Sequence, residues 1–204
     1  MITLPPARPS RVVVEPVRPV VDHGTFAAKA TLDEPMQVLA DVFADGHDVV
    51  DAVVTWRHVD AAGAATPWQE SPMAPLGNDR FEAWIVPDRL GRLEYDVVGW
   101  IDHLESWRRG VVKKIDADLD VSVELLTGAT LLADVLDRAV SLGDDHSLGD
   151  HRLVKALRKR LLAGDHSTLD DDHWTDVFAR VSLREPVGRF GSSMPVDVDP
   201  LRGA

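Results

Sequence analysis

Apolar and polar residues alternate in short runs from residue 11 to about residue 116, a period of two that is typical of strands with one buried face. Turn-forming segments rich in Gly, Pro, Asp and Asn, such as ADGHD, AAGAA and PDRLGR, separate the runs. No helical pattern lies between these runs, so the helical connections that a parallel sheet needs are not indicated. The predicted strands cover residues 11–17, 25–31, 36–44, 51–59, 66–73, 80–87, 92–102 and 106–115.

The same alternation predicts which side chains form the core. Trp56 lies on an early strand, where an immunoglobulin-like sandwich often buries a tryptophan against the opposite sheet. We therefore predict a mainly β fold, an immunoglobulin-like antiparallel β-sandwich, although the cysteine pair of immunoglobulin domains is missing. The predicted core residues are Val38, Ala40, Val42, Ala52, Val54, Trp56, Phe81, Ala83 and Ile85.

After about residue 118 the apolar period changes from two to 3.6, which predicts helices over residues 120–142, 148–164 and 168–183. The first is predicted despite Gly128, and Thr168 is the expected start of the third, ahead of an acidic first turn. The predicted inward residues are Leu125, Ala129, Leu132, Leu136 and Ala139, then Leu153, Leu157 and Leu161, and finally Trp174, Val177, Phe178 and Val181.

The C-terminal residues 184–204 are rich in Pro, Gly and Ser and show no period. They are expected to form a linker toward a further domain. The predicted organisation is a sandwich over residues 1–117, a helical segment over 118–183 and this linker over 184–204.

Charge and composition narrow the classes of partner. The chain has 34 acidic and 22 basic residues, a formal net charge of -12, which would repel a phosphate backbone. Cysteine is absent, which excludes disulfides, cysteine-ligated zinc and thiol nucleophiles. No apolar run approaches the ~20 residues of a membrane span, and the N-terminus lacks the apolar region of a signal peptide. We expect a cytoplasmic protein with neither a nucleic-acid nor a membrane partner.

The sequence holds no local catalytic motif: there is no Gly-rich phosphate loop after a strand, no GxSxG and no HExxH. The acidic pair Asp144 and Asp145 and the run 170–172 stand at loop and helix-start positions, where solvated carboxylates are expected. We predict no catalytic residue and no cofactor.

Histidine and aspartate also lie close together around the helix ends, and such groups can hold zinc. Asp, Ser and Thr at these positions are good helix caps as well, and the capping interpretation is favoured, so no metal site is predicted. The residues concerned are His146, Asp150, His151, His166 and His173.

Two of the six tryptophans stand in alternating runs on either side of the PDRLG turn. If the runs are strands, one face carries Trp84 and Trp100 together with the carboxylates Glu82, Glu94 and Asp96. Flat sugar faces stack on exposed aromatic rings, and neighbouring carboxylates bind hydroxyls, so the set is a candidate carbohydrate site. Coverage of this face by the helices or by a partner is the favoured alternative.

Three segments together show a family resemblance: RVVVEPVRPVVDHGTFAAKATLDEPMQVLADVFADGHDVVDAVVTWRH, FEAWIVPDRLGRLEYDVVGWIDHLESWRRGVVKKIDADLD and ELLTGATLL. They resemble the N-terminal region of the bacterial α-1,4-glucan:maltose-1-phosphate maltosyltransferases of the α-amylase superfamily. The likeness runs from about Arg11 to about Leu132, continues loosely through the helices and returns in PVDVDPL.

The resemblance implies a β-sandwich and a helical segment that precede a catalytic (β/α)₈ barrel. In that family the barrel transfers maltose from maltose 1-phosphate to an α-1,4-glucan with retention, through an aspartate nucleophile and a glutamate acid/base. None of those catalytic positions maps onto this chain. The expectation is a non-catalytic module that serves homodimer formation, through its N-terminal and helical regions, and supports the barrel. The alternative is a glucan-binding module that uses exposed tryptophans.

Overall fold

The computed structural model describes residues 10–142, 148–184 and 187–200, which form two compact units. The first, the sandwich unit, holds the described residues up to 46, residues 50–101 and the C-terminal residues from 187 onward. The second, the helical unit, holds residues 47–49 and the described part of 102–184. The helical unit is therefore inserted into the sequence of the sandwich unit.

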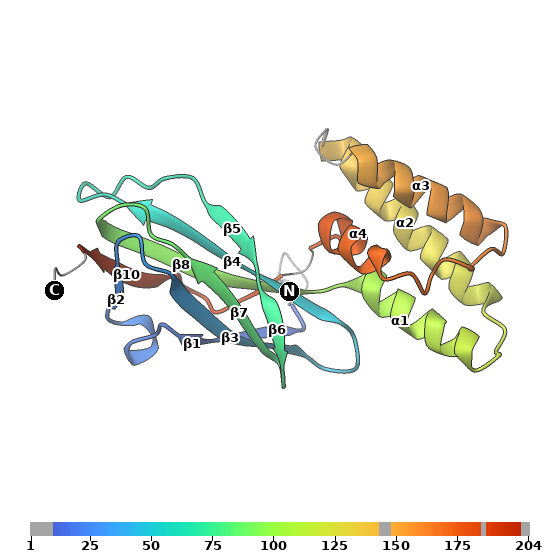
Figure 1. The fold of residues 1–204 in the computed structure, drawn as a ribbon, viewed down its shortest axis with the longest axis horizontal. Helices are drawn as coiled ribbons and strands as arrows, with labels where there is room; N and C mark the ends of the chain where they lie inside the picture. The colour runs from blue at the N-terminus through green and yellow to red at the C-terminus, as the bar shows by residue number, and fades with distance from the viewer. Residues whose placement is uncertain (1–9, 143–147, 185–186, 201–204) are drawn as a thin grey trace, which may run out of the picture. The chain divides into compact units, whose positions relative to one another are not determined.

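A four-stranded sheet forms one layer of the sandwich unit (Figure 1). Its order is β1 (Val12–Arg18), β3 (Met36–Ala44), β7 (Arg80–Ile85) and β6 (Ala74–Gly77). All three neighbouring pairs are antiparallel. The register of β3 against β7 places Gln37 opposite Trp84 and Leu39 opposite Glu82.

A six-stranded sheet forms the other layer, centred on the long strand β8 (Gly91–Ile101). One side of β8 pairs along its length with β4 (Val50–Val59), which in turn pairs with β5 (Gln69–Pro72). β10 (Met194–Asp199) pairs with the first part of β8, and β9 (Gly188–Arg189) pairs near its end. β2 (Ala28–Thr31) completes the sheet as the parallel neighbour of β10, and the short 3₁₀ turn η1 (Asp22–Gly24) precedes it.

The main core lies between the two sheets and confirms the alternation in the sequence. The predicted core residues of β3, β4 and β7 are buried there, and Trp56 packs against them half-buried. β8 adds Leu93, Tyr95 and Val97 from the other side. The Tyr95 hydroxyl donates a 2.7 Å hydrogen bond to the carbonyl oxygen of Pro19, which satisfies the one polar atom of this ring. The sandwich is thus confirmed, with one parallel pair that the antiparallel prediction did not include.

The linker prediction is wrong for β9 and β10, which cover residues 188–189 and 194–199. Met194, Val196 and Val198 alternate with polar residues and lie buried in the core. Gly188 passes so close to β1 that a Cβ atom there would lie 2.3 Å from the carbonyl oxygen of Val12. The short period in MPVDVD was hidden by the Pro, Gly and Ser residues before it, and this segment belongs to the fold.

The strand predicted over 106–115 is also wrong, because these residues lie in α1 (His103–Asp116). Asp102 caps this helix: its carboxylate accepts a hydrogen bond from the backbone N–H of Glu105. Leu104, Arg108 and Val111 recur at helical spacing on the buried face. The β-branched pair in RRGVVKK favours a strand by local propensity. Packing of the buried face of α1 stabilises the helix instead.

The described residues of the helical unit contain four helices, α1 and the three whose existence was predicted. These are α2 (Ser122–Leu142), α3 (Leu148–Leu162) and α4 (His173–Val181). α4 begins five residues after the predicted start at Thr168, and Leu153 of α3 is exposed while Val154 is buried in its place. The remaining predicted inward residues of α3 and α4 are buried, and α2 buries Leu125, Ala129 and Leu132 as expected.

Candidate functional site

The five candidate site residues do not share a face. Glu82 and Trp84 lie on β7 in the four-stranded sheet, whereas Glu94, Asp96 and Trp100 lie on β8 in the six-stranded sheet. The turn at residues 86–90 carries the chain from one layer of the sandwich to the other, so the two strands are not a hairpin. Their outward residues therefore point to opposite sides of the unit, and the prediction of one shared surface is wrong.

On the six-stranded sheet the candidate side chains already contact other residues of the protein. Glu94 accepts two hydrogen bonds from Arg57, at 3.1 and 2.9 Å, and Asp96 accepts one from Arg189 at 2.6 Å. Trp100 is 1% exposed and packs with Val53, Val98 and Val187. A sugar cannot reach the Trp100 ring in this structure, because the segment that leads into β9 helps to cover it.

Trp68, which the sequence interpretation did not single out, lies on the same side as Glu94. It is 45% exposed, and the Arg57 guanidinium stands 4.5 Å from its ring centroid. Arg57 thus contacts an aromatic face and a carboxylate at once, a common arrangement for a guanidinium. Alternation in the predicted strand 66–73 was a signal for an outward Trp68, but the pairing with Arg57 depends on the register of β4 and β5.

On the four-stranded sheet Trp84 remains accessible, with 52% of its surface exposed. Its direct cross-strand neighbour is Gln37, whose side-chain N–H donates a 2.9 Å hydrogen bond to Glu82. The Arg18 guanidinium donates a 3.5 Å hydrogen bond to the side-chain oxygen Oε1 of Gln37. We call Trp84 and its polar neighbours Arg18, Gln37 and Glu82 the Trp84 surface.

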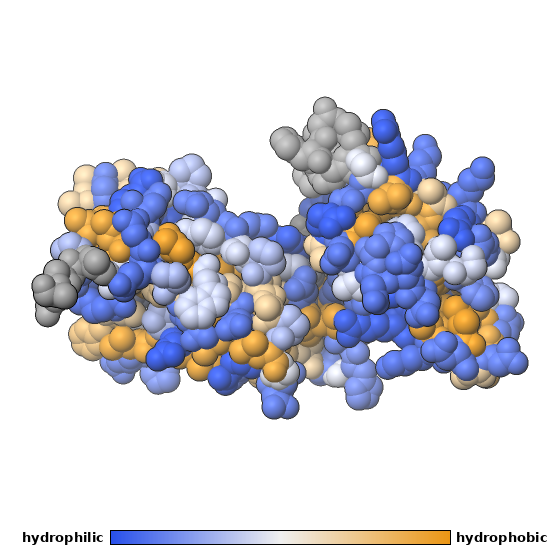
Figure 2. Space-filling model, viewed as in Figure 1, coloured by the Kyte–Doolittle hydropathy of each residue, from blue (hydrophilic) through white to orange (hydrophobic). Residues whose placement is uncertain are grey.

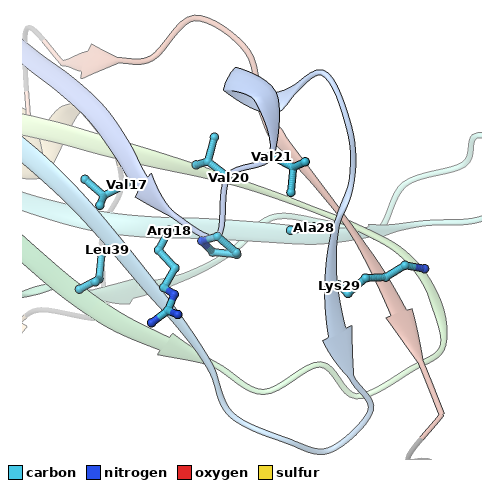
Figure 3. Close-up of a pocket in the computed structure, with 8 residues that line it drawn as sticks. Val17, Arg18, Val20, Val21, Ala28, Lys29 and Leu39 are labelled. Atoms are coloured by element: carbon cyan, nitrogen blue, oxygen red, sulfur yellow. The ribbon is translucent and has the colours of Figure 1, made fainter.

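A hollow with a volume of about 520 Å³ lies next to this surface. Arg18 and Leu39 line it together with residues of the loop after β1 and of β2, which include Val20, Val21 and Lys29. Figure 3 shows that the Arg18 and Lys29 side chains point away from each other. Lys29 also forms ion pairs with Asp197 and Asp199. The two cations do not converge on one point, so the hollow is not a phosphate site.

One titratable group is buried inside the sandwich unit near the end of β4. His58 is 5% exposed, with Nε2 3.0 Å from Asp88 Oδ1. Burial lowers the pKa of His58 more than the neighbouring Asp88 carboxylate raises it. A histidine next to an aspartate resembles half of a catalytic pair, and the nearby Thr66 hydroxyl oxygen accepts a 3.0 Å hydrogen bond from the His58 backbone N–H.

In the helical unit the charged residues form a structural clamp around Glu105, which is 3% exposed. Its carboxylate accepts hydrogen bonds from Arg108 at 2.8 and 2.9 Å and from Arg109 at 2.8 Å. Arg108 also donates to the carbonyl oxygen of Leu169 and to the Thr175 hydroxyl. Burial raises the pKa of Glu105, but the hydrogen bonds from the two arginines lower it by more, so the group stays ionised.

Two of the candidate residues near the helix ends, Asp150 and His173, have polar partners within the helical unit. Asp150 forms an ion pair with Arg180, and Asp171 accepts a hydrogen bond from the backbone N–H of His173; His146 lies outside the described residues. Within the parts of the chain that the structure describes, no three His, Cys, Asp or Glu residues are grouped to hold a metal ion. None of the described helices is long and apolar enough to cross a membrane.

Comparison with known proteins places the two units together in one family. Residues 10–200 match the family model described as "Alpha-1,4-glucan:maltose-1-phosphate maltosyltransferase, domain N/S". The relatives include the α-1,4-glucan:maltose-1-phosphate maltosyltransferase of Myxococcus xanthus, 44% identical over 128 residues, which are 63% of this chain and 19% of that protein.

Two further relatives carry the same name. The protein of Chlorobaculum tepidum is 42% identical over 122 residues, 60% of this chain and 18% of its own length. That of Burkholderia pseudomallei is 34% identical over 196 residues, 93% of this chain and 16% of its own length. The chain thus spans less than a fifth of the length of these relatives.

Proposed function

Because the chain belongs to the domain N/S family of the α-1,4-glucan:maltose-1-phosphate maltosyltransferases, we propose that it is a non-catalytic module of such an enzyme. The enzyme would be cytoplasmic and would extend α-1,4-glucan from maltose 1-phosphate. The observation that carries the proposal is the match over residues 10–200, next to relatives of which the chain spans about a fifth.

The state of the buried and half-buried carboxylates supports the non-catalytic part of the proposal. Retaining glycosyl transfer needs two carboxyl groups about 5 Å apart across one sugar. Glu94, Asp96 and Glu105 are each held by arginine instead. The 204-residue chain, incubated with maltose 1-phosphate and maltohexaose, should release no phosphate. Phosphate release above a buffer control would overturn this part.

We assign homodimer formation to the helical unit, where an apolar stripe follows the outer side of α2. Val123 and Leu126 are 71% and 58% exposed, and Leu119 is exposed in the turn before the helix. The hydroxyls of Thr127 and Thr130 donate to the carbonyl oxygens of Val123 and Leu126, so these residues present their methyl groups. Figure 2 shows apolar surface in this unit around the turn between α1 and α2. Such a patch fits a second copy of the chain.

The oligomeric state tests this assignment. Light scattering after size exclusion should give a dimer for the wild-type chain and a monomer for Leu126→Glu. Val140→Glu is the matched control, because Val140 lies on the same helix and is 82% exposed but stands about 21 Å along the helix axis from Leu126, beyond the end of the stripe. A dimer that survives Leu126→Glu, or that is lost equally in Val140→Glu, would exclude the stripe as the interface.

Support of the catalytic barrel is the remaining part of the proposal. Removal of the matching module from the Myxococcus xanthus relative should lower the melting temperature of the remainder and reduce its soluble yield. An unchanged melting temperature would argue that the module has no supporting role.

A second candidate function is binding of α-1,4-glucan by the module itself. The favouring observation is the half-exposed Trp84 ring beside the hydrogen-bonded pair Gln37 and Glu82. Aromatic rings flanked by oriented polar groups are typical of carbohydrate sites.

A further inference from the structure

We propose that the Trp84 surface of the four-stranded sheet is an α-1,4-glucan subsite, with the Trp84 ring as stacking platform and the Gln37–Glu82 pair as the hydroxyl-binding group. This inference rests on the second proposed function and gives it a location, a set of contacts and a direction for the bound chain.

The exposure of Trp84 supports stacking. A tryptophan is a large apolar group that a fold normally buries, and more than half of this one faces solvent. The two other tryptophans on outer faces are occupied: Trp68 carries Arg57 over its ring, and Trp100 is covered by Val187 and its neighbours. Within the part of the chain that the structure describes, no aromatic or cationic side chain stacks on Trp84. Its ring is therefore available to the apolar face of a sugar.

The polar partners are held in place by one another. Gln37 donates a 2.9 Å hydrogen bond to Glu82 and accepts a longer one, at 3.5 Å, from Arg18. Its amide nitrogen has a second proton, and the Glu82 carboxylate has further lone pairs, so the pair offers one more donor and several acceptors. Sugar hydroxyls both donate and accept. Binding groups that are oriented in advance lose little conformational entropy when a ligand arrives.

Charge favours a neutral ligand on this surface. The chain as a whole has a formal net charge of -12, whereas the opposite charges of Arg18 and Glu82 on the Trp84 surface cancel each other. In the adjacent row, Asp41 and Arg80 also form an ion pair with each other. A polyanion would meet no excess positive charge here, and a polycation no excess negative charge. A neutral polysaccharide matches this balance.

The hollow gives the bound chain a direction. Leu39 stands opposite Glu82 in the register of β3 and β7, and both Leu39 and Arg18 line the hollow. A glucan with one ring stacked on Trp84 would pass over Gln37 and Glu82 and reach the apolar lining of Leu39 and Val17. Figure 3 shows Val17 and Leu39 on neighbouring strands at this border. Longer maltooligosaccharides should accordingly bind more tightly than maltose.

Calorimetric titration of the full chain with maltoheptaose, with cellohexaose as the sugar control, tests the inference. Trp84→Ala should weaken maltoheptaose binding about tenfold, which corresponds to about 1.4 kcal/mol, the order expected for one aromatic stacking contact. Gln37→Ala should weaken it less. Trp68→Ala is the matched control, an exposed tryptophan on the other sheet, and should bind as wild type does. Circular dichroism verifies that each variant is folded.

Three results would overturn the subsite. Wild-type affinity in Trp84→Ala would place glucan elsewhere and would leave the second proposed function standing. Absence of binding by the wild-type chain at millimolar maltoheptaose would remove both. Conversion of a wild-type dimer to a monomer by Trp84→Ala, with no effect on glucan, would make this face a subunit interface.

Discussion

Gly128 occupies a buried position on α2 where any side chain would overlap the indole of Trp107. A Cβ atom there would lie 2.0 Å from a ring carbon of Trp107. The same indole N–H donates a 2.7 Å hydrogen bond to the carbonyl oxygen of Glu124, which ties the ring across α2. The glycine that weakens the helical pattern in the sequence is thus the residue that lets α1 and α2 approach closely.

Gly128→Ala should destabilise the chain by about 1–3 kcal/mol, because overpacking of the Trp107 ring outweighs the gain in helix propensity. Gly110→Ala is the control: Gly110 is exposed on α1 and nothing lies within 4 Å of the added Cβ. That variant should gain about 0.5–1 kcal/mol. Urea unfolding followed by far-ultraviolet circular dichroism measures both changes, and equal stabilisation by the two substitutions would disprove the Trp107 argument.

At the scale of single elements, the Glu105 clamp joins α1 to α4 and to the turn at Leu169 through Arg108. Both charges are buried, so each depends on the other for solvation. The clamp thus joins α1, the turn at Leu169 and α4, and the two later segments lie more than 60 residues after Arg108 in the sequence. This role explains why charged residues are buried in the helical unit.

Glu105→Gln should destabilise the helical unit at pH 7 by about 3 kcal/mol, because the buried Arg108 loses its anion. The pKa of Glu105 is lowered by folding, so its contribution is present above the unfolded-state pKa of about 4.3 and is lost as the pH falls through the folded-state pKa. Wild type and variant should therefore converge once the pH falls below the folded-state pKa of Glu105. Unfolding free energies from pH 7 to pH 3 test this, and parallel curves would contradict it.

β9 and β10 belong to the sandwich although they follow the helical unit in the sequence. β10 stands between β2 and β8, and its buried side chains join the main core. A chain that ends at residue 186 should lose the cooperative unfolding transition of the sandwich, because Leu93 and Tyr95 would be exposed at an open sheet edge. A chain that ends at residue 200 should melt as the full chain does. If the full chain and both truncated chains had equal melting temperatures, the interpretation of this segment as a linker would be restored.

At the scale of the whole molecule, the two units have separate cores. The clusters of the sandwich unit and that of the helical unit share no residue. The helical unit is inserted between β8 and β9, which are antiparallel neighbours paired through Gly99 and Gly188. The two ends of the insertion therefore lie close together, as is common for domain insertions.

Replacement of residues 102–186 by a short Gly-Ser linker should leave a folded sandwich, because its core loses no member and the linker spans only the distance between paired strands. A dispersed amide spectrum in two-dimensional nuclear magnetic resonance is the expected readout. A collapsed, poorly dispersed spectrum would show that the sandwich depends on the helical unit.

The sequence by itself determined which face of β3, β4, β7 and α4 is buried, because the periods of 2 and 3.6 are local properties of the chain. It correctly indicated Val38, Ala83 and Phe178 as buried. Only the tertiary structure decided which strands pair, since pairing depends on contacts between residues distant in sequence. That pairing separated Trp84 from Trp100, covered Trp100 with the returning C-terminal segment, and placed Gln37 beside Trp84 on a neighbouring strand.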